Sequence, residues 1–174
     1  MYGYQKHKVF ISFYHHDDQQ YKNYIDLNLS GNIINKSVMP CEYDPDNSDE
    51  YIKRLIREDK VSDSSVIVVL VGSNTKKRKH VDWEIYAGLR ASINGNAGLV
   101  GIMLPSVEKT IDGKYYYDDM PARLADNLKT NYAYLYDWDT AINCFDSIIE
   151  KAFQSRISRR NLIDNTRPQM KYNR

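Results

Sequence analysis

Glu84 is the residue whose type and position most directly suggest chemistry, and it lies in the stretch HVDWEIYAGL at residues 80–89. Val81 and Ile85 begin an apolar stripe that repeats every four residues, as on the buried face of an amphipathic helix. On such a helix Glu84 lies about 100° around from Ile85, at the edge of the stripe, and Gly88 one turn later leaves open space beside it. A carboxylate at this boundary can be partly desolvated and still reach a cleft, so Glu84 is a candidate catalytic residue. The alternative is a solvated helix face.

Other polar side chains follow an apolar segment in the stretch FYHHDD. Asp17 and Asp18 could hold a metal, cap the next helix or accept hydrogen bonds from a sugar, and capping is the most common use of Asp at such a position. His15 and His16 could be acid and base groups, but neighbouring side chains in an extended segment point to opposite sides, so we expect at most one to face a site. The cations at 76–79 could meet phosphates or be solvated.

Apolar and amphipathic segments alternate along the chain, and these segments must position the candidate residues. The strongest strand, SSVIVVLVG, is apolar throughout, which predicts burial on both faces in a parallel sheet. The order of elements predicts the α/β class: a single doubly wound domain with a mostly parallel five-stranded sheet in the flavodoxin-like order, flanked by helices. The predicted strands are 8–14, a short one near 38–42, 64–72, 97–105 and 132–138, and the predicted helices are 15–29, 48–61, 80–93, 121–128 and one from 139 onward.

The length of 174 residues fits one domain, which we expect to span residues 1–155. Residues 156–174 form a basic C-terminal tail that we expect to be helical, frayed or in contact with a partner. Residues 106–120 carry turn signals without core periodicity, so they predict a surface loop that could act as a lid.

Composition limits the partners. Lys and Arg number 24 against 23 for Asp and Glu, so net charge gives no reason to expect nucleic acid or a membrane as partner. The longest apolar run, 66–71, is too short to cross a bilayer, and the N-terminus lacks a signal peptide's apolar region, so a cytoplasmic location is expected. Cys41 and Cys144 lack the spacing of a metal site and are interpreted as packing thiols; no metal is expected.

The predicted sheet brings the candidate residues to one edge. In an open parallel sheet, ligands bind beyond the carboxyl ends of the strands, where the chain changes direction around the sheet. We expect three segments there: FYHHDD, GSNTKKRK and the start of the helix that carries Glu84. No glycine-rich phosphate loop is present, because GNAGLVG matches neither GxGxxG nor a Walker motif.

Three stretches, KVFISFYHHDD, SSVIVVLVGSNTKKRKHVDWEI and GLVGIML, resemble the TIR-like (Toll/interleukin-1 receptor-like) domains of bacterial antiphage defence, most closely the ThsB family of the Thoeris system. The resemblance runs to about residue 105. It implies cleavage of the nicotinamide-ribose bond of NAD by a Glu on the helix after the third strand, where Glu84 stands. NAD is then a substrate, and no cofactor is expected.

The resemblance also implies partners and further site residues. A cyclic ADP-ribose isomer would be the diffusible nucleotide that activates a ThsA-like effector, and the chain would self-assemble on activation. The residues expected to bind substrate are Phe13, Tyr14, His15, Asp17, Ser73 and Trp83. Of these, Phe13, Tyr14 and Trp83 could stack on a ring of the substrate.

Two other functions are alternatives to an NAD-cleaving enzyme. One is a TIR-like interaction module without catalysis, in which Glu84 is a surface carboxylate and the 106–120 loop and the tail bind partners. The other is a response-regulator receiver, which needs a phosphorylatable Asp at the end of the third strand. Gly72, Ser73 and Asn74 stand there, which excludes the receiver.

Overall fold

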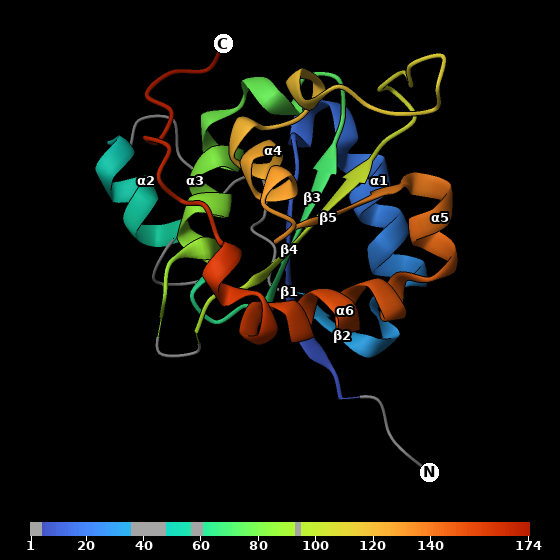
Figure 1. The fold of residues 1–174 in the computed structure, drawn as a ribbon, viewed down its shortest axis with the longest axis horizontal. Coiled ribbons are helices and arrows are strands. Elements are labelled where there is room, and N and C mark those ends of the chain that lie inside the picture. Colours follow the sequence, from blue (N-terminus) through green and yellow to red (C-terminus); the bar gives the residue numbers. More distant parts are fainter. Residues whose placement is uncertain (1–4, 36–47, 57–60, 93–94) are drawn as a thin grey trace.

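A parallel sheet of five strands, covered by helices on both faces, forms the centre of the structure (Figure 1). The computed structural model describes residues 5–35, 48–56, 61–92 and 95–174. The strands follow the order β2-β1-β3-β4-β5, and each neighbouring pair runs parallel. This order confirms the predicted doubly wound, flavodoxin-like α/β fold. The strands are β1 (His7–Ser12), β2 (Ile33–Asn35), β3 (Val66–Val71), β4 (Gly98–Met103) and β5 (Tyr134–Asp137).

Helices pack against both faces of the sheet. One face is covered by α2 (Asp49–Leu55), α3 (Lys79–Leu89) and α4 (Ala122–Lys129), and the other by α1 (His15–Asn28), α5 (Trp138–Asn143) and α6 (Phe145–Ser158). The prediction of one closing helix is wrong, because the backbone at Cys144 leaves the helical region (φ −139°, ψ 33°) and separates α5 from α6. No helix among the described residues combines the length and apolarity that crossing a bilayer requires.

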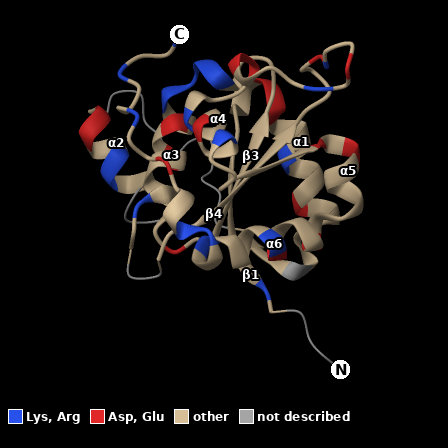
Figure 2. Cartoon of the chain, in the orientation of Figure 1, with Lys and Arg blue, Asp and Glu red and all other residues tan. Residues whose placement is uncertain are grey.

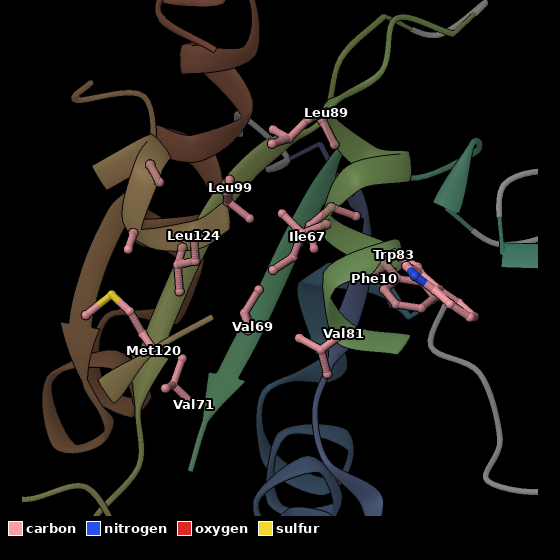
Figure 3. Packing of buried hydrophobic residues seen from close by; sticks show 14 of the residues in the cluster. Phe10, Ile67, Val69, Val71, Val81, Trp83, Leu89, Leu99, Met120 and Leu124 are labelled. Atoms are coloured by element: carbon pink, nitrogen blue, oxygen red, sulfur yellow. The ribbon is translucent and has the colours of Figure 1, made fainter. Parts of the chain in front are cut away.

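The core consists of two apolar clusters, one on each face of the sheet. Every residue of β3 and β4 is buried, and Figure 2 shows no charged residue on either strand. Phe10 belongs to the cluster under α3, whose packing Figure 3 shows, while Val9 and Ile11 belong to the opposite cluster. Because side chains alternate along a strand, Ser12 shares the face of Phe10 and points toward α3.

Other sequence predictions, on a weak strand, the two cysteines and a helix cap, have different outcomes in the structure. The weak strand expected near 38–42 lies outside the described residues, and the edge strand that the structure describes is β2. Cys41 also lies outside them, and Cys144 is exposed, so the interpretation of Cys144 as a packing thiol is wrong. The cap predicted for α2 is confirmed, since Ser48 accepts a hydrogen bond from the backbone of Tyr51 at 3.3 Å.

The loop at 106–120 is a surface segment fixed at several points. Tyr115 Oη donates to Asp137 Oδ1 at 2.6 Å, and Lys109 Nζ lies 2.8 Å from the other oxygen of the same carboxylate. Near its end, Lys76 Nζ donates to the carbonyl of Asp118 at 2.8 Å. The loop is therefore held against β5 and the segment before α3, and its role as a lid stays a prediction.

Residues 163–174, here named the C-terminal strap, lie across α4 and α3 (Figure 1). We expected a helical or frayed tail, and the structure has the end of α6, a short 3-10 helix at Arg160–Leu162 and then this extended segment. Its backbone finds partners on the helices, which explains why it lies flat on them. Asp164 exchanges two hydrogen bonds with the Asn127 side chain, at 2.7 and 2.9 Å, and the Met170 carbonyl accepts from Trp83 Nε1 at 2.8 Å.

A buried ion pair joins α3, α4 and the strap. Arg123 Nε donates to Asp82 Oδ1 at 2.9 Å, and the two side chains are 0% and 5% exposed respectively. Asp82 Oδ2 also accepts from the backbone of Met170 at 2.8 Å, and Arg123 Nη1 donates to Asn165 Oδ1 at 2.9 Å. The pair therefore links three segments that are distant in sequence.

We predict that Arg123→Met destabilises the fold by about 3–5 kcal/mol, because it leaves the Asp82 carboxylate buried without its cation. Urea denaturation followed by circular dichroism measures the loss. Arg167→Met is the matched control: it removes a pair with Asp126 made by an arginine that is 45% exposed, and it should cost about 1 kcal/mol or less. Equal losses in the two variants would contradict the role given to the buried pair.

Candidate functional site

The carboxyl ends of β1 and β3 lie side by side, because the strands are paired in parallel with Ser12 opposite Val69. The segments that follow them therefore meet, as the strand order predicts. Asn74 Nδ2 donates to Asp17 Oδ2 at 2.8 Å, and the Arg78 guanidinium lies 3.9 Å from the centre of the Tyr14 ring. The segments after β1 and β3 thus form one surface with the start of α3.

Glu84 lies at this edge of the sheet and is buried, with 4% of its surface exposed. Its carboxylate accepts a hydrogen bond from Ser12 Oγ, and Ser12 is itself 1% exposed. The bond joins the last residue of β1 to the second turn of α3, across the face of the sheet that Phe10 also lines. Glu84 is therefore neither a solvated helix face nor open to a cleft in this conformation.

The close approach of α3 to the sheet brings Glu84 to β1. A Cβ at Gly88 would lie 2.6 Å from Ile67 Cγ1 on β3, so only glycine allows this packing distance. The sequence interpretation placed open space beside Glu84 at Gly88, which is wrong, because Ile67 fills that position. The glycine sets the depth of the helix instead.

One histidine, His80, lies on the same helix as the Glu84 carboxylate, and a second, His15, is close enough to His80 to affect its pKa. His80 is one turn before Glu84 on α3, and burial is the main cause that lowers its pKa, followed by the charge of Lys79. Burial is also the main cause that lowers the pKa of His15, and the charge of His15 is the smallest of the causes that lower the pKa of His80. Both rings are therefore mostly neutral at pH 7 and can accept a proton.

Arg78 and Tyr14 form the outer part of the site. Among the described residues, no hydrogen-bond acceptor meets the buried Nε of Arg78. A guanidinium with an unused donor beside an aromatic ring can bind a phosphate or carboxylate. The sequence suggested only that the run at 76–79 could meet phosphates. In the structure Lys76 and Lys79 are paired with Asp119 and Asp49, and Arg78 is the cation of the run that lies beside Tyr14.

The predicted substrate-binding residues divide into two groups. Tyr14, His15 and Asp17 lie at the edge that holds Glu84, although Asp17 is tied to His16 and Asn74. Phe13, Trp83 and Ser73 pack mainly elsewhere, although the ring centre of Phe13 lies 4.1 Å from that of His15 and the ring centre of Trp83 lies 5.2 Å from that of His80. Phe13 is packed in the cluster on the opposite face of the sheet, and Ser73 lines a separate cavity with the loop at 106–111.

Trp83 is a buried wall residue between α2 and the C-terminal strap. It is 1% exposed, its Nε1 donates to the Met170 carbonyl, and the ammonium groups of Lys53 and Lys79 lie 4.8 and 5.1 Å from its ring centre. Figure 3 shows it on the side of α3 away from Leu124. Trp83 is therefore covered by its neighbours and is not open to a substrate ring in this conformation.

Sequence reasoning missed Ser12 and His80, and it named Arg78 only as one member of the basic run at 76–79. The spacing of His80, four residues before Glu84, was a usable signal, because residues one helical turn apart share a face. For Ser12 the signal was its alternation with Phe10 along the strand.

Asp18 links α1 to the segment after β3. The N-cap of α1 is Tyr14, so Asp17 and Asp18 lie in the first turn and the capping interpretation is wrong. The Asp18 side chain lies against Gly72 and accepts from Thr75 Oγ1 at 3.4 Å. Burial, with the charge of Asp17 as a smaller cause, raises the pKa of Asp18 to about 6. The described residues hold no group of three or more side chains of metal-binding type.

We predict that Ser12→Ala destabilises the protein by about 1–3 kcal/mol, because the buried Glu84 carboxylate loses a donor. Thermal and urea denaturation measure the effect. Ser158→Ala, at an exposed serine whose Oγ donates to the Gln154 carbonyl at 3.2 Å, is the control and should change stability by about 0.5 kcal/mol or less. A neutral Ser12→Ala would show that Glu84 does not depend on this hydrogen bond.

We also predict that Asp18→Asn stabilises the fold relative to wild type as pH rises. The pKa of Asp18 in the folded protein, about 6, lies above its ordinary value of 3.8, so its contribution is complete below about pH 4 and is lost as pH rises through 6. The stability difference between variant and wild type should grow by on the order of 2 kcal/mol between pH 4 and 7. Asp112→Asn, at an exposed loop position, controls for loss of one carboxylate, and a constant Asp18→Asn difference would refute the prediction.

Comparisons with known proteins show which family the chain belongs to. A family model described as Thoeris protein ThsB, TIR-like domain, matches residues 10–109. No curated protein matches the chain. Among solved structures, the TIR domains of the activated Roq1 resistosome directly recognizing the pathogen effector XopQ are similar at 13% identity, with 91% of this chain and 84% of that chain covered and a TM-score of 0.42. The family match spans more than half of the chain and includes both Ser12 and Glu84. The chain therefore belongs to the family of Thoeris ThsB proteins with a TIR-like domain.

Proposed function

We propose that this protein is an antiphage-defence enzyme that cleaves the nicotinamide-ribose bond of NAD, with Glu84 as the catalytic carboxylate. In this proposal the product is cyclised to a cyclic ADP-ribose isomer, which diffuses to a ThsA-like effector and activates it. The observation that carries the proposal is a carboxylate fixed at the carboxyl edge of β1 and β3, where ligands bind in doubly wound folds. Membership of the ThsB family supports it.

The proposed reaction suits a single carboxylate. The bond between the nicotinamide nitrogen and C1 of the ribose breaks, and its electron pair leaves with nicotinamide, whose ring nitrogen becomes neutral. The leaving group therefore needs no general acid, unlike that of an ordinary glycoside. The Glu84 carboxylate stabilises the positive charge that develops on the ribose and orients its hydroxyls.

Ring closure uses a second group of the same substrate. A hydroxyl of the adenosine portion bonds to C1 of the ribose and gives up its proton, which requires that the two ends are held together and water is excluded. His80, one helical turn from Glu84, is a neutral base that can take this proton, since burial lowers its pKa. Arg78 is the candidate partner of the substrate phosphates.

Substrate access requires a change in conformation. Glu84 is 4% exposed, so the ribose can reach it only after the carboxylate is uncovered and exchanges Ser12 for the substrate hydroxyls. Self-assembly on activation, the expectation drawn from the family resemblance, would couple this change to infection. A resting protein with little activity is consistent with the buried carboxylate.

A second candidate function is a non-catalytic interaction module. The burial of Glu84 favours it, because a buried, hydrogen-bonded carboxylate can be purely structural. The loop at 106–120 offers a docking surface, with Ile111 fully exposed and Tyr116 65% exposed at its outer side. In this alternative no nucleotide product is made.

The two candidates are separated by expressing the gene with its natural effector partner in infected cells and comparing wild type with Glu84→Gln at equal expression. We predict that Glu84→Gln lowers formation of nicotinamide and of a cyclic ADP-ribose-type product by about 100-fold or more, since it removes the charge that stabilises the transition state. Phage protection should be lost with it. Nucleotide products are measured by mass spectrometry.

Glu108→Gln is the matched control, because it makes the same change at an exposed loop position. It should retain both product and protection. Protection that survives Glu84→Gln, with no nucleotide product in either strain, would contradict the enzyme and favour the interaction module.

A further inference from the structure

A cluster of cationic side chains lies away from Glu84, in a cavity of about 400 Å³ between α4, the segment before α3 and the C-terminal strap. We name it the basic groove. Figure 2 shows Lys and Arg on the segment leading into α3 and on the strap, at the end of the molecule where the chain terminates. The cationic residues that line the groove are Lys76, Lys77, Lys129, Arg167 and Arg174.

The charge in the groove is unbalanced. Two side-chain carboxylates, Asp118 and Asp126, face these five cations, so the side chains that line the groove carry a formal excess of three positive charges, whereas the net charge of the whole chain is +1. Arg167 is already paired with Asp126, at 2.7 Å, and Lys76 with Asp119, at 3.2 Å. The excess therefore resides in the other cations of the groove.

Three of the lining cations have no carboxylate partner among the residues that the structure describes. In the described part of the chain, Lys77 donates to the Asn74 side chain at 3.0 Å, the Lys129 ammonium lies 4.9 Å from the centre of the Tyr117 ring, and the backbone of Arg174 donates to the Lys77 carbonyl at 3.0 Å. None of the three has an acidic partner within ion-pair distance among these residues. Like charges held together in this way favour binding of a multivalent anion.

The rest of the lining is apolar and aromatic. Met120 contributes from the segment before α4, Ala122 and Ala125 contribute from α4 itself, and Tyr117 is 49% exposed. Cavities that bind small molecules commonly measure about 300–1,000 Å³ and combine an apolar lining with a few polar groups. The groove therefore offers a surface for a flat ring next to a surface for several phosphates.

We propose that the basic groove binds a phosphorylated nucleotide with two or more phosphates, at a site distinct from that of Glu84. The uncommitted cations Lys77, Lys129 and Arg174 meet the phosphates, and Tyr117 with the apolar floor meets the base. A nucleic acid is disfavoured, because the chain as a whole is nearly neutral and the cations proposed to bind phosphate share one cavity. This site is independent of the proposed catalysis, since Glu84 does not line the groove.

Isothermal titration calorimetry of the full chain with ADP, and separately with inorganic pyrophosphate, tests the proposal. We expect saturable binding of both, tighter for ADP. Lys129→Glu should weaken ADP binding by about tenfold or more, because it replaces a phosphate-binding cation with an anion. Glu84→Gln should leave ADP binding unchanged, which keeps this test separate from that of catalysis.

Lys151→Glu is the matched control, since Lys151 is a surface lysine on α6 whose ammonium lies 4.4 Å from the centre of the Tyr134 ring, much as Lys129 lies over Tyr117. It should change ADP affinity by less than about twofold. Circular dichroism confirms that both variants fold. Three results would overturn the proposal: no saturable binding of ADP, equal weakening by both charge reversals, or tighter binding of a short oligonucleotide than of ADP. Pyrophosphate that binds as tightly as ADP would overturn the base-binding role of Tyr117.

Discussion

Burial of two carboxylates on α3, Asp82 and Glu84, is the constraint on which the arrangement of the other segments depends. A buried carboxylate is costly unless it is paired or hydrogen-bonded, so each must find partners outside its own helix. Asp82 is satisfied by Arg123 of α4 and by the backbone of Met170, and Glu84 by Ser12 of β1. The helix is thereby fixed between the sheet on one side and α4 with the strap on the other.

This constraint connects the fold to the proposed chemistry. Gly88 lets α3 sit close to β3, and the parallel pairing of β1 with β3 brings Ser12 within reach of Glu84. The same geometry hides the carboxylate, so a catalytic role needs a conformation in which substrate hydroxyls replace Ser12. In the structure the hydrogen bond with Ser12 holds the carboxylate in its buried position, and the strap contacts α3 through Met170.

The fold was predictable because its signals are local and consistent. The continuous apolarity of SSVIVVLVG predicted a central parallel strand, and the spacing of Val81, Ile85 and Leu89 predicted α3. The site was less predictable, because its details depend on contacts between distant residues. Trp83 and Phe13 have side chains that can stack on a ring, but Trp83 packs against the strap and Phe13 packs in the core on the opposite face of the sheet. Residues 163–174 have no sequence periodicity that would predict their contacts with α3 and α4.

The most direct test of the central claim is a crystal structure of the Glu84→Gln protein in its assembled form with NAD bound. The account predicts the nicotinamide ribose at the carboxyl edge of β1 and β3, with its hydroxyls within hydrogen-bond distance of the side chain at position 84 and the phosphates near Arg78. NAD bound elsewhere, with the side chain at position 84 still buried against Ser12, would contradict the claim that this carboxylate acts on the substrate.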